Sequence, residues 1–381
     1  MLKTQRISLA VCGLVLSSTM AFGADTIDAA FKEGKVSGNI TAYGVKTNMK
    51  DGKKDSNAGY GTIGLGYETG VVKGFSAKTA FVAGHAVADG SFEDSDPTTT
   101  DDDNFKKALM TEAYIKYATD LFSLTAGRQA IDLEWLGDFN EAVVAAITPN
   151  KDTTIVLGYT NRVAVADEDE IIDFSEPTED GAYVADIKYS GLQSVEFNPY
   201  YYSAPDAVDF YGLKTTFTAD MFGAVAHYAK SSVDGQFGLN NNEEDGSIGH
   251  VELNTTISDF TAAAGYIKTD KNGGVGLMDT YGDNINPFDS GNNVYNADAK
   301  TVYGSLGYTV ASVELGALYG QTTYGTNDDF KEKELNLTAG YPITESLATS
   351  LLLADIDGEE TDSTDGTVDQ QYATLKVQYS F

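Results

Sequence analysis

The sequence predicts an all-β protein, a transmembrane antiparallel up-and-down β-barrel of 18 strands, with 16 as the alternative count. Three observations predict this fold class. The last segment, 369–381, alternates polar and apolar residues with a strict period of two and ends on Phe381. Short and long connections alternate between the predicted strands, and aromatic residues recur beside the short ones. In a membrane barrel, the apolar face of each strand meets lipid and the polar face lines the lumen.

The first 23 residues have the pattern of a secretory signal peptide. Lys3 and Arg6 give a positive start, and residues 7–16 form an apolar run too short to span as a helix. Small residues end the segment, so we expect cleavage after Gly23. The single cysteine, Cys12, lies within it, so the mature chain is expected to carry no disulfide and no thiolate metal site.

The charge is strongly negative. The full chain has 25 basic and 57 acidic residues, and removing the two basic residues of the signal segment leaves 23 − 57 = −34. This balance excludes non-specific nucleic-acid binding, which requires a basic surface. No window after residue 23 is apolar enough for a transmembrane helix, so strands must do any spanning.

Residues 24–34 space their apolar side chains like one face of a short helix, and we expect a periplasmic segment that caps or plugs the barrel. The barrel itself is predicted over 35–381 as one domain. Its strands are expected near 36–47, 58–69, 75–88, 107–119, 122–129, 141–148, 153–165, 182–190, 195–203, 209–218, 221–232, 246–257, 260–269, 300–310, 313–323, 332–341, 347–357 and 369–381. Most have about the 9–11 residues that a tilted strand needs to cross hydrocarbon.

The connections predict the sidedness of the barrel. Links such as 120–121 and 311–312 are short, and the links between them, such as 89–106 and 270–299, are mostly long and polar. Short turns on the periplasmic rim and long extracellular loops are typical of outer-membrane barrels. An even strand count brings both termini to the short-turn rim, so the first strand is predicted to pair with the last.

Two bands of aromatic residues are predicted on the lipid-facing side. The lower band, beside the short turns, comprises Tyr67, Phe75, Tyr117, Phe122, Tyr189, Phe217, Phe222, Phe260, Tyr308, Tyr341 and Phe381. The upper band comprises Phe81, Tyr159, Tyr183, Tyr201, Tyr211, Tyr228, Tyr266 and Tyr319.

The segments ADTIDAAFKEGKVSGNI, LTAGRQ (124–129) and TPNKDTTIVLGYTNR (148–162), with 18 strands ending in Phe381, resemble the OprD-like outer-membrane porin family. The resemblance implies a water-filled channel for passive diffusion of ions and small hydrophilic solutes, with an inward-folding third loop. It also implies that Phe381 is an assembly signal for the barrel-assembly machinery. The loops of this chain are unusually acidic for the family.

Strand parity assigns a set of charges to the lumen, among them Lys78, Glu112, Lys116, Arg162, Asp186, Lys188, Lys214, Glu252, Glu314, Glu334 and Lys376. Arg128 is counted with the candidate pore-lining charges although its parity differs. Bases are concentrated in the first half of the barrel and acids in the second, which predicts a transverse field across the pore. The acidic external loops concentrate cations at the mouth while the inward bases and acids roughly balance, which predicts weak cation selectivity that fades as salt rises. The alternative is that these residues are merely solvated and paired with neighbours. Arg128 has two placements open, because alternation from Leu124 turns it outward unless the strand ends and the next loop carries it inward.

Loop 130–140 is the most apolar of the long loops and holds the only tryptophan, Trp135. We expect it to fold into the barrel as a constriction, with Asp132, Glu134, Trp135 and Asp138 at the narrowing. Packing on the outer rim or against a neighbouring subunit is the alternative, and a homotrimer stays open.

Three acidic runs occupy 93–103, 167–180 and 357–365. They read as solvated mobile loops, or as sites where Ca²⁺ or Mg²⁺ bridges carboxylates to one another or to lipopolysaccharide. Their spacing defines no metal site, and no other cofactor is expected.

An enzyme is not expected. His85, His227 and His250 are scattered over three strands, and neither Gly-x-Ser-x-Gly nor His-Glu-x-x-His occurs. The remaining alternative is a surface barrel with an adhesive or structural role. Size disfavours it, since 18 strands should leave an aqueous lumen.

Overall fold

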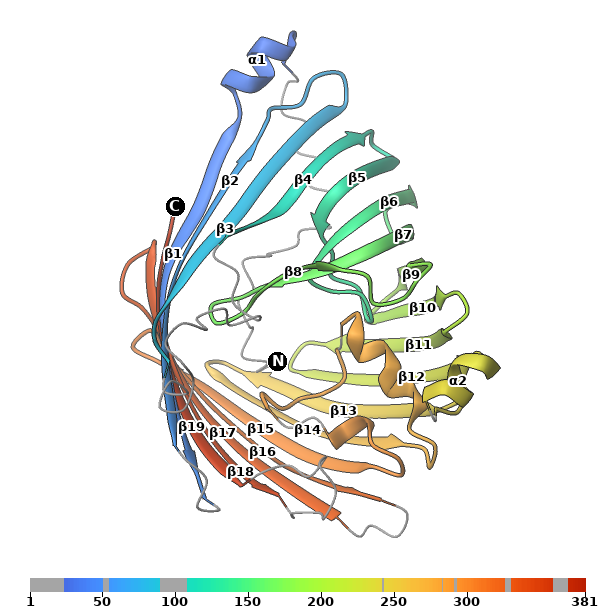
Figure 1. Cartoon of the computed structure of the whole chain (residues 1–381), viewed down its shortest axis with the longest axis vertical. Coiled ribbons are helices and arrows are strands. Elements are labelled where there is room, and N and C mark those ends of the chain that lie inside the picture. The colour runs from blue at the N-terminus through green and yellow to red at the C-terminus, as the bar shows by residue number, and fades with distance from the viewer. Residues whose placement is uncertain are drawn as a thin grey trace.

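The strands of this chain close into a ring. The computed structural model describes residues 24–50, 55–89, 108–241, 243–282, 284–290, 293–325, 330–358 and 369–381. In this part of the chain, 18 strands form an antiparallel barrel wall in which sequence neighbours pair (Figure 1). The first strand, β1 (Lys35–Met49), pairs with the last, β19 (Gln370–Ser380), from Asn39 opposite Ser380 to Met49 opposite Gln370. The predicted closure is therefore confirmed.

The other wall strands lie close to the predicted ranges. They are β2 (Ser56–Glu68), β3 (Phe75–Asp89), β4 (Ala108–Ala118), β5 (Phe122–Ala130), β6 (Phe139–Asn150), β7 (Thr153–Ala166), β9 (Ala182–Leu192), β10 (Val195–Ala204), β11 (Val208–Ala219), β12 (Phe222–Val233), β13 (Ser247–Ile257), β14 (Phe260–Thr269), β15 (Lys300–Val310), β16 (Val313–Tyr324), β17 (Phe330–Pro342) and β18 (Leu347–Gly358).

The short turns show why the chain reverses so tightly on one rim. Ala311 and Ser312 join β15 to β16 with φ of 49° and 66°, and Asp220 and Ser258 also have positive φ in their turns. Two-residue hairpin turns with positive φ match the right-handed twist of the strands they join, which overcomes the poor left-handed propensity of residues such as alanine.

Alternation along the strands separates an apolar outer surface from a polar inner one. Outward residues stay exposed, including Phe222 at 60% and Tyr319 at 52%, whereas inward residues such as Asn39 and Thr301 are buried. Most members of both predicted aromatic bands are among the exposed large hydrophobic residues. Aromatic rings in two bands near the ends of the strands are suited to the headgroup boundary on each side of a membrane. The predicted apolar outer surface with its aromatic bands is thereby confirmed.

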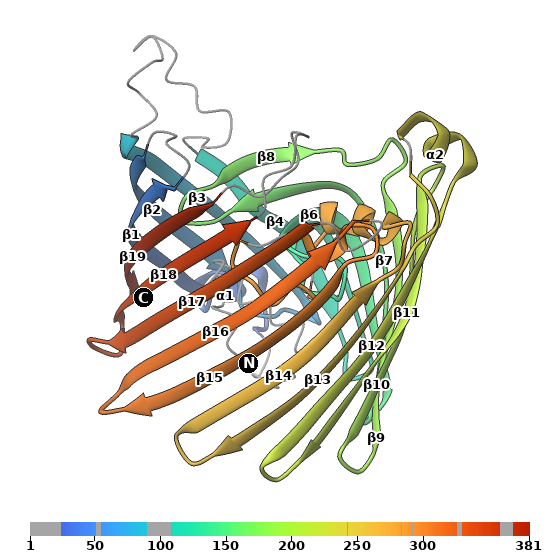
Figure 2. The same ribbon diagram turned by 90° about the horizontal axis from the view of Figure 1, so that it is seen from below.

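The ring is not a uniform cylinder. On the rim of the long loops, the ends of β5, β6 and β7 bend inward, toward the lumen. The last β4–β5 pair is Ala113 with Arg128, after which β4 stays with β3 while β5 continues with β6. Gly127, with φ of 125°, lies at this bend. A short strand that the sequence analysis missed, β8 (Ile171–Ser175), pairs with the end of β7 and runs across the barrel (Figures 1 and 2).

Within the described residues, three helices lie in the long loops. They are α2 (Gly235–Asn241), η2 (Gly274–Thr280) and η3 (Asn293–Tyr295). Buried side chains of the segment 270–299, such as Tyr281 and Ile285, belong to the same apolar cluster as Trp135. No helix within the described residues is long and apolar enough to cross a membrane.

The N-terminal helix α1 (Ile27–Lys32) corrects the expectation of a plug. Thr26 caps it, since the Ala29 amide donates to the Thr26 hydroxyl at 3.1 Å. It packs on the β2–β3 turn, where the Gly70 amide donates to the Ala30 carbonyl at 2.8 Å. Figure 1 shows α1 beyond the ends of β1 and β2, away from the lumen. The predicted signal segment, 1–23, the acidic run 93–103 and most of 357–365 lie outside the described residues.

Candidate functional site: the lumen and its inward segments

The inner faces of the strands carry most of the charges assigned to the lumen by parity. Lys78, Glu112, Lys116, Asp186, Lys188, Lys214, Glu252, Glu314 and Glu334 all lie on the face opposite the exposed apolar rows. Their environments differ, however. Lys188 and Glu314 are exposed, whereas Asp186 is 0% and Glu334 1% exposed. Those two buried carboxylates are covered by protein, so they do not present charge to open lumen.

Lys78 and Glu112 form a direct ion pair on neighbouring strands, with Nζ and Oε2 2.7 Å apart. Lys116 and Lys188 have no ion-pair partner among the residues that the structure describes. The basic charge available to a solute is therefore smaller than the number of inward lysines.

Arg128 and Arg162 sit in a cluster rather than as isolated charges on the pore wall. Arg128 Nη2 lies 2.8 Å and Arg162 Nη1 3.6 Å from the Glu141 carboxylate. The Arg128 guanidinium also lies 4.3 Å above the Phe174 ring of β8. Arg128 is on the same strand face as Leu124. Because the end of β5 bends inward at Gly127, this face of the strand contacts β6 and β8 at Arg128 instead of lipid. Neither placement left open by the sequence describes this.

Loop 131–138, which joins β5 to β6, lies against the inner wall. Trp135 is 0% exposed and donates from Nε1 to the Tyr200 hydroxyl at 2.9 Å. Tyr200 in turn contacts His227 Nε2 at 2.8 Å. The ring of Phe210 lies 6.0 Å from that of Trp135, so the indole is enclosed by the wall strands β10 to β12.

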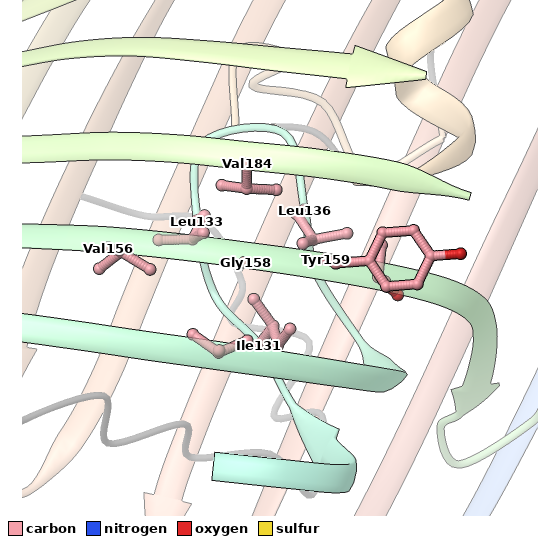
Figure 3. Close-up of a pocket in the computed structure, with 9 residues that line it drawn as sticks. Ile131, Leu133, Leu136, Val156, Gly158, Tyr159 and Val184 are labelled. Atoms are coloured by element: carbon pink, nitrogen blue, oxygen red, sulfur yellow. The ribbon is translucent and has the colours of Figure 1, made fainter. Parts of the chain in front are cut away.

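Apolar side chains fix the rest of this loop. Figure 3 shows Ile131, Leu133 and Leu136 facing Val156 and Val184 of the wall. These groups close on one another without room for a water molecule. The contact is a packed seam and not a ligand pocket.

The charged residues of the predicted constriction take different positions. Glu134 is buried and paired with Lys214 of β11, on the wall against which the loop lies, with Oε1 and Nζ 2.8 Å apart. Asp132 is exposed. Asp138 has φ of 57°, and its carbonyl accepts from the Ile131 amide at 2.9 Å, which closes the base of the loop. Asp132 is thus the member of the set whose charge faces solvent.

A second inward element, the β7–β8 hairpin, holds part of the acidic run 167–180. Phe174 of β8 packs with Val82 and Leu109, on the inner faces of β3 and β4. At the hairpin tip, Glu168 Oε1 lies 2.9 Å from Nζ of Lys376 on β19. The expectation of a solvated mobile loop is therefore wrong for the part of this run that docks through Glu168 and Phe174, whereas Glu176, Glu179 and Asp180 are exposed.

The third inward element is segment 270–299. Glu334 Oε1 accepts from the Asp289 and Ser290 amides at 3.1 Å each. Asn284 Nδ2 donates to the Leu133 carbonyl at 2.9 Å, so this segment also holds the Trp135 loop. At its far end, Lys268 donates to the Asp298 carboxylate and lowers the pKa of that carboxyl.

Buried polar groups complete the wall network. Asp186 accepts from Asn198 Nδ2 at 2.8 Å and from the Tyr202 hydroxyl at 2.9 Å. Glu252 accepts from the Tyr303 hydroxyl at 2.7 Å. Such pairing is expected, since unpaired buried polar groups are costly. No cluster of three or more metal-binding side chains occurs within the described residues.

Glu168 is a lumen-side residue that the sequence analysis did not assign, whereas strand parity had already placed its partner Lys376 on the lumen-facing side of the last strand. Glu168 gave no local signal, because its partner lies on a strand 208 residues later.

Phe381 ends the wall. Its amide and carbonyl exchange hydrogen bonds with Gly38 of β1, both at 3.0 Å, and its ring is 51% exposed on the lower aromatic band. The C-terminal residue is thus the last member of the closing ladder.

Comparisons with known proteins support the fold and the family. A family model described as "Putative outer membrane protein" matches residues 34–233, just over half of the chain. Among solved structures, Pseudomonas aeruginosa OpdO has a TM-score of 0.73 at 14% identity, covering 92% of this chain and 98% of its own. OccK8 (OprE) from the same species has a TM-score of 0.72 at 14% identity, with 92% and 99% covered.

Acinetobacter baumannii OccAB4 has a TM-score of 0.71 at 16% identity, covering 92% of this chain and 98% of its own. A search of curated protein sequences gives no significant match. The resemblance seen in the sequence is confirmed: the chain belongs to this family of bacterial outer-membrane proteins and has the OprD-like porin barrel fold.

Proposed function

We propose that this barrel is a porin for passive diffusion of ions and small hydrophilic solutes, with weak cation selectivity. The observation that carries the proposal is the inner wall, which is polar along 18 strands and narrowed by three segments held in place by specific contacts. A barrel of this strand number encloses more space than its own side chains fill.

The charges exposed to the lumen support the direction of selectivity. Lys78, Lys214 and Lys376 are each neutralised by a carboxylate. Glu252 and Glu314 have no ion-pair partner within the described part of the chain. Lys116 and Lys188 offset these two charges, and exposed Asp132 of loop 131–138 adds one further negative charge, so the resulting preference for cations should be weak.

Single-channel recording of the purified protein in a planar bilayer tests the function. We expect discrete ion-conducting steps. If no steps occur under any salt or voltage condition, the porin proposal is wrong, and the adhesive or structural alternative gains support.

Reversal potentials test the selectivity. Glu252→Gln with Glu314→Gln should shift the reversal potential toward anions, even at 1 M salt where the Debye length is about 3 Å, because these charges lie beside the permeating ion. Glu334→Gln is the matched control, since its carboxylate is covered and a glutamine oxygen can still accept the two amides. An equal shift in the control would contradict the assignment of exposed and covered charges.

A further inference from the structure

The N-terminal helix α1 presents an apolar face that no described part of the chain covers. Ile27 is 66% and Phe31 58% exposed. They are four residues apart, so they lie on the same side of the helix. Ala30 is buried at 2% exposure against the barrel. The helix therefore has one side fixed to the barrel and a different, apolar side left open.

The orientation of this face is fixed by the barrel. The Ala24 amide donates to the Val71 carbonyl at 2.7 Å, and the Gly70 amide donates to the Ala30 carbonyl at 2.8 Å. The Tyr67 hydroxyl donates to the Phe31 carbonyl. These contacts tie a six-residue helix, too short to be stable alone, to the β2–β3 turn.

The apolar face continues the lipid-facing surface. The Phe31 ring stacks on Tyr67, with centroids 6.4 Å apart and an interplanar angle of 17°. Tyr67 follows Ile63 and Leu65 at alternate positions on β2, and both of these are exposed on the outer side. Val36, at the start of β1, is 60% exposed beside it, opposite Tyr67 in the ladder.

We propose that α1 is an interfacial anchor, whose Ile27–Phe31 face inserts into the periplasmic leaflet of the outer membrane next to the lower aromatic band. The occupant is phospholipid, because the face is continuous with a surface that already meets lipid. Exposed Lys35 begins β1 just after the helix, and its long side chain can extend to the lipid phosphates from this depth. Figure 1 shows α1 at the edge of the barrel, beyond the ends of β1 and β2.

Spin labels at single cysteines test the anchor. Cys12 lies in the predicted signal segment, so an introduced cysteine is the sole one in the mature chain. Ile27→Cys and Phe31→Cys report on the apolar face of the helix. Asp28→Cys and Lys32→Cys are matched controls on the same helix. Leu121→Cys is the reference position, in the β4–β5 turn, where the side chain is 59% exposed. Each labelled barrel is placed in vesicles of phosphatidylethanolamine and phosphatidylglycerol, and heat-modifiability confirms folding.

The measured quantity is the ratio of the collision rate with oxygen to the collision rate with a water-soluble nickel chelate. We expect this ratio to be at least threefold higher for labels at 27 and 31 than for labels at 28 and 32. Their ratio should match that at 121. Equal nickel access at all four helix positions would show that the face lies in water. Protection of 27 and 31 from both reagents would show that protein covers it. Either result overturns the proposal, and neither depends on whether the barrel conducts.

Discussion

At the scale of single residues, glycines of the inner wall make room for the inward segments. A Cβ on Gly320 of β16 would lie 2.5 Å from Cζ of Phe288, which belongs to segment 270–299. A Cβ on Gly212 would similarly meet the Tyr200 ring at 2.5 Å. A glycine on one strand therefore leaves the space that an aromatic ring of another strand or segment fills, because protein interiors are closely packed.

Gly320→Val should displace Phe288 and loosen segment 270–299, at a cost of about 1–3 kcal/mol for overpacking. The expected readout is greater current noise in single-channel records and a lower temperature for the heat-modifiability transition. Phe288→Ala in the same chain should relieve the contact with the ring, leaving the Tyr303 Cβ as the nearest atom, within 3 Å of the new Cβ, and should make the records quieter. If the double variant is as noisy as Gly320→Val alone, Phe288 is not the group displaced.

The Glu168–Lys376 pair holds the tip of the β7–β8 hairpin, with side chains only 16% and 11% exposed. Glu168→Gln should weaken this contact by about 1.5–3 kcal/mol, as for a hydrogen bond to a charged group. We expect altered open-channel conductance with more frequent transitions. Glu176→Gln is the control, because Glu176 is exposed and close in sequence. Identical behaviour of the two variants would argue against a role for the pair.

At the scale of elements, loop 131–138 behaves as a unit because three kinds of contact hold it. Leu133 and Leu136 pack on the wall, Glu134 pairs with Lys214, and Asn284 holds the backbone from segment 270–299. Since Trp135 is the only tryptophan, its fluorescence reports on this loop alone.

In the folded barrel, we expect blue-shifted Trp135 emission with little quenching by iodide, because the indole is 0% exposed. Glu134→Gln removes the charge partner of Lys214, whose side chain is only 20% exposed, and should raise the quenching constant at least twofold, since a poorly solvated charge without a partner is costly. Asp132→Asn in the same loop should leave quenching unchanged, because Asp132 is exposed. Strong iodide quenching of the unaltered protein would mean that the loop is not docked in solution.

At the scale of the whole molecule, stability depends on closure, because an open strand edge cannot be satisfied in lipid. The β1–β19 ladder runs from Asn39 to Met49 on β1 and is extended by the two hydrogen bonds between Gly38 and Phe381. Every other wall strand pairs with its sequence neighbours, so this ladder alone joins distant parts of the chain into the ring.

Deleting Phe381 removes two ladder hydrogen bonds and one ring of the lower aromatic band. We expect secretion to continue but the yield of heat-modifiable folded barrel in the outer membrane to fall severalfold. Phe381→Tyr, which keeps an aromatic terminus and both backbone bonds, should assemble almost normally. A normal yield from the deletion variant would contradict a role for Phe381 in assembly.

The sequence alone determined the barrel wall. Period-two alternation, as from Ala373 to Phe381, marks which face meets lipid, and the alternation of short and long links orders the strands. Both signals are local, because each strand pairs with its neighbour and each side chain's direction follows from parity. The predicted ranges therefore lie close to the observed strands, and the closing pair was predicted from the strand count.

Only the tertiary structure decided what fills the lumen. Parity could place Glu334 and Asp186 inward, but it could not show that folded segments cover them. Composition made 167–180 look like an external loop, whereas Glu168 reaches Lys376 across the barrel. The physical reason is that loop docking depends on partners far apart in sequence. A loop's own residues do not specify these contacts, whereas a strand's own alternation specifies its two faces.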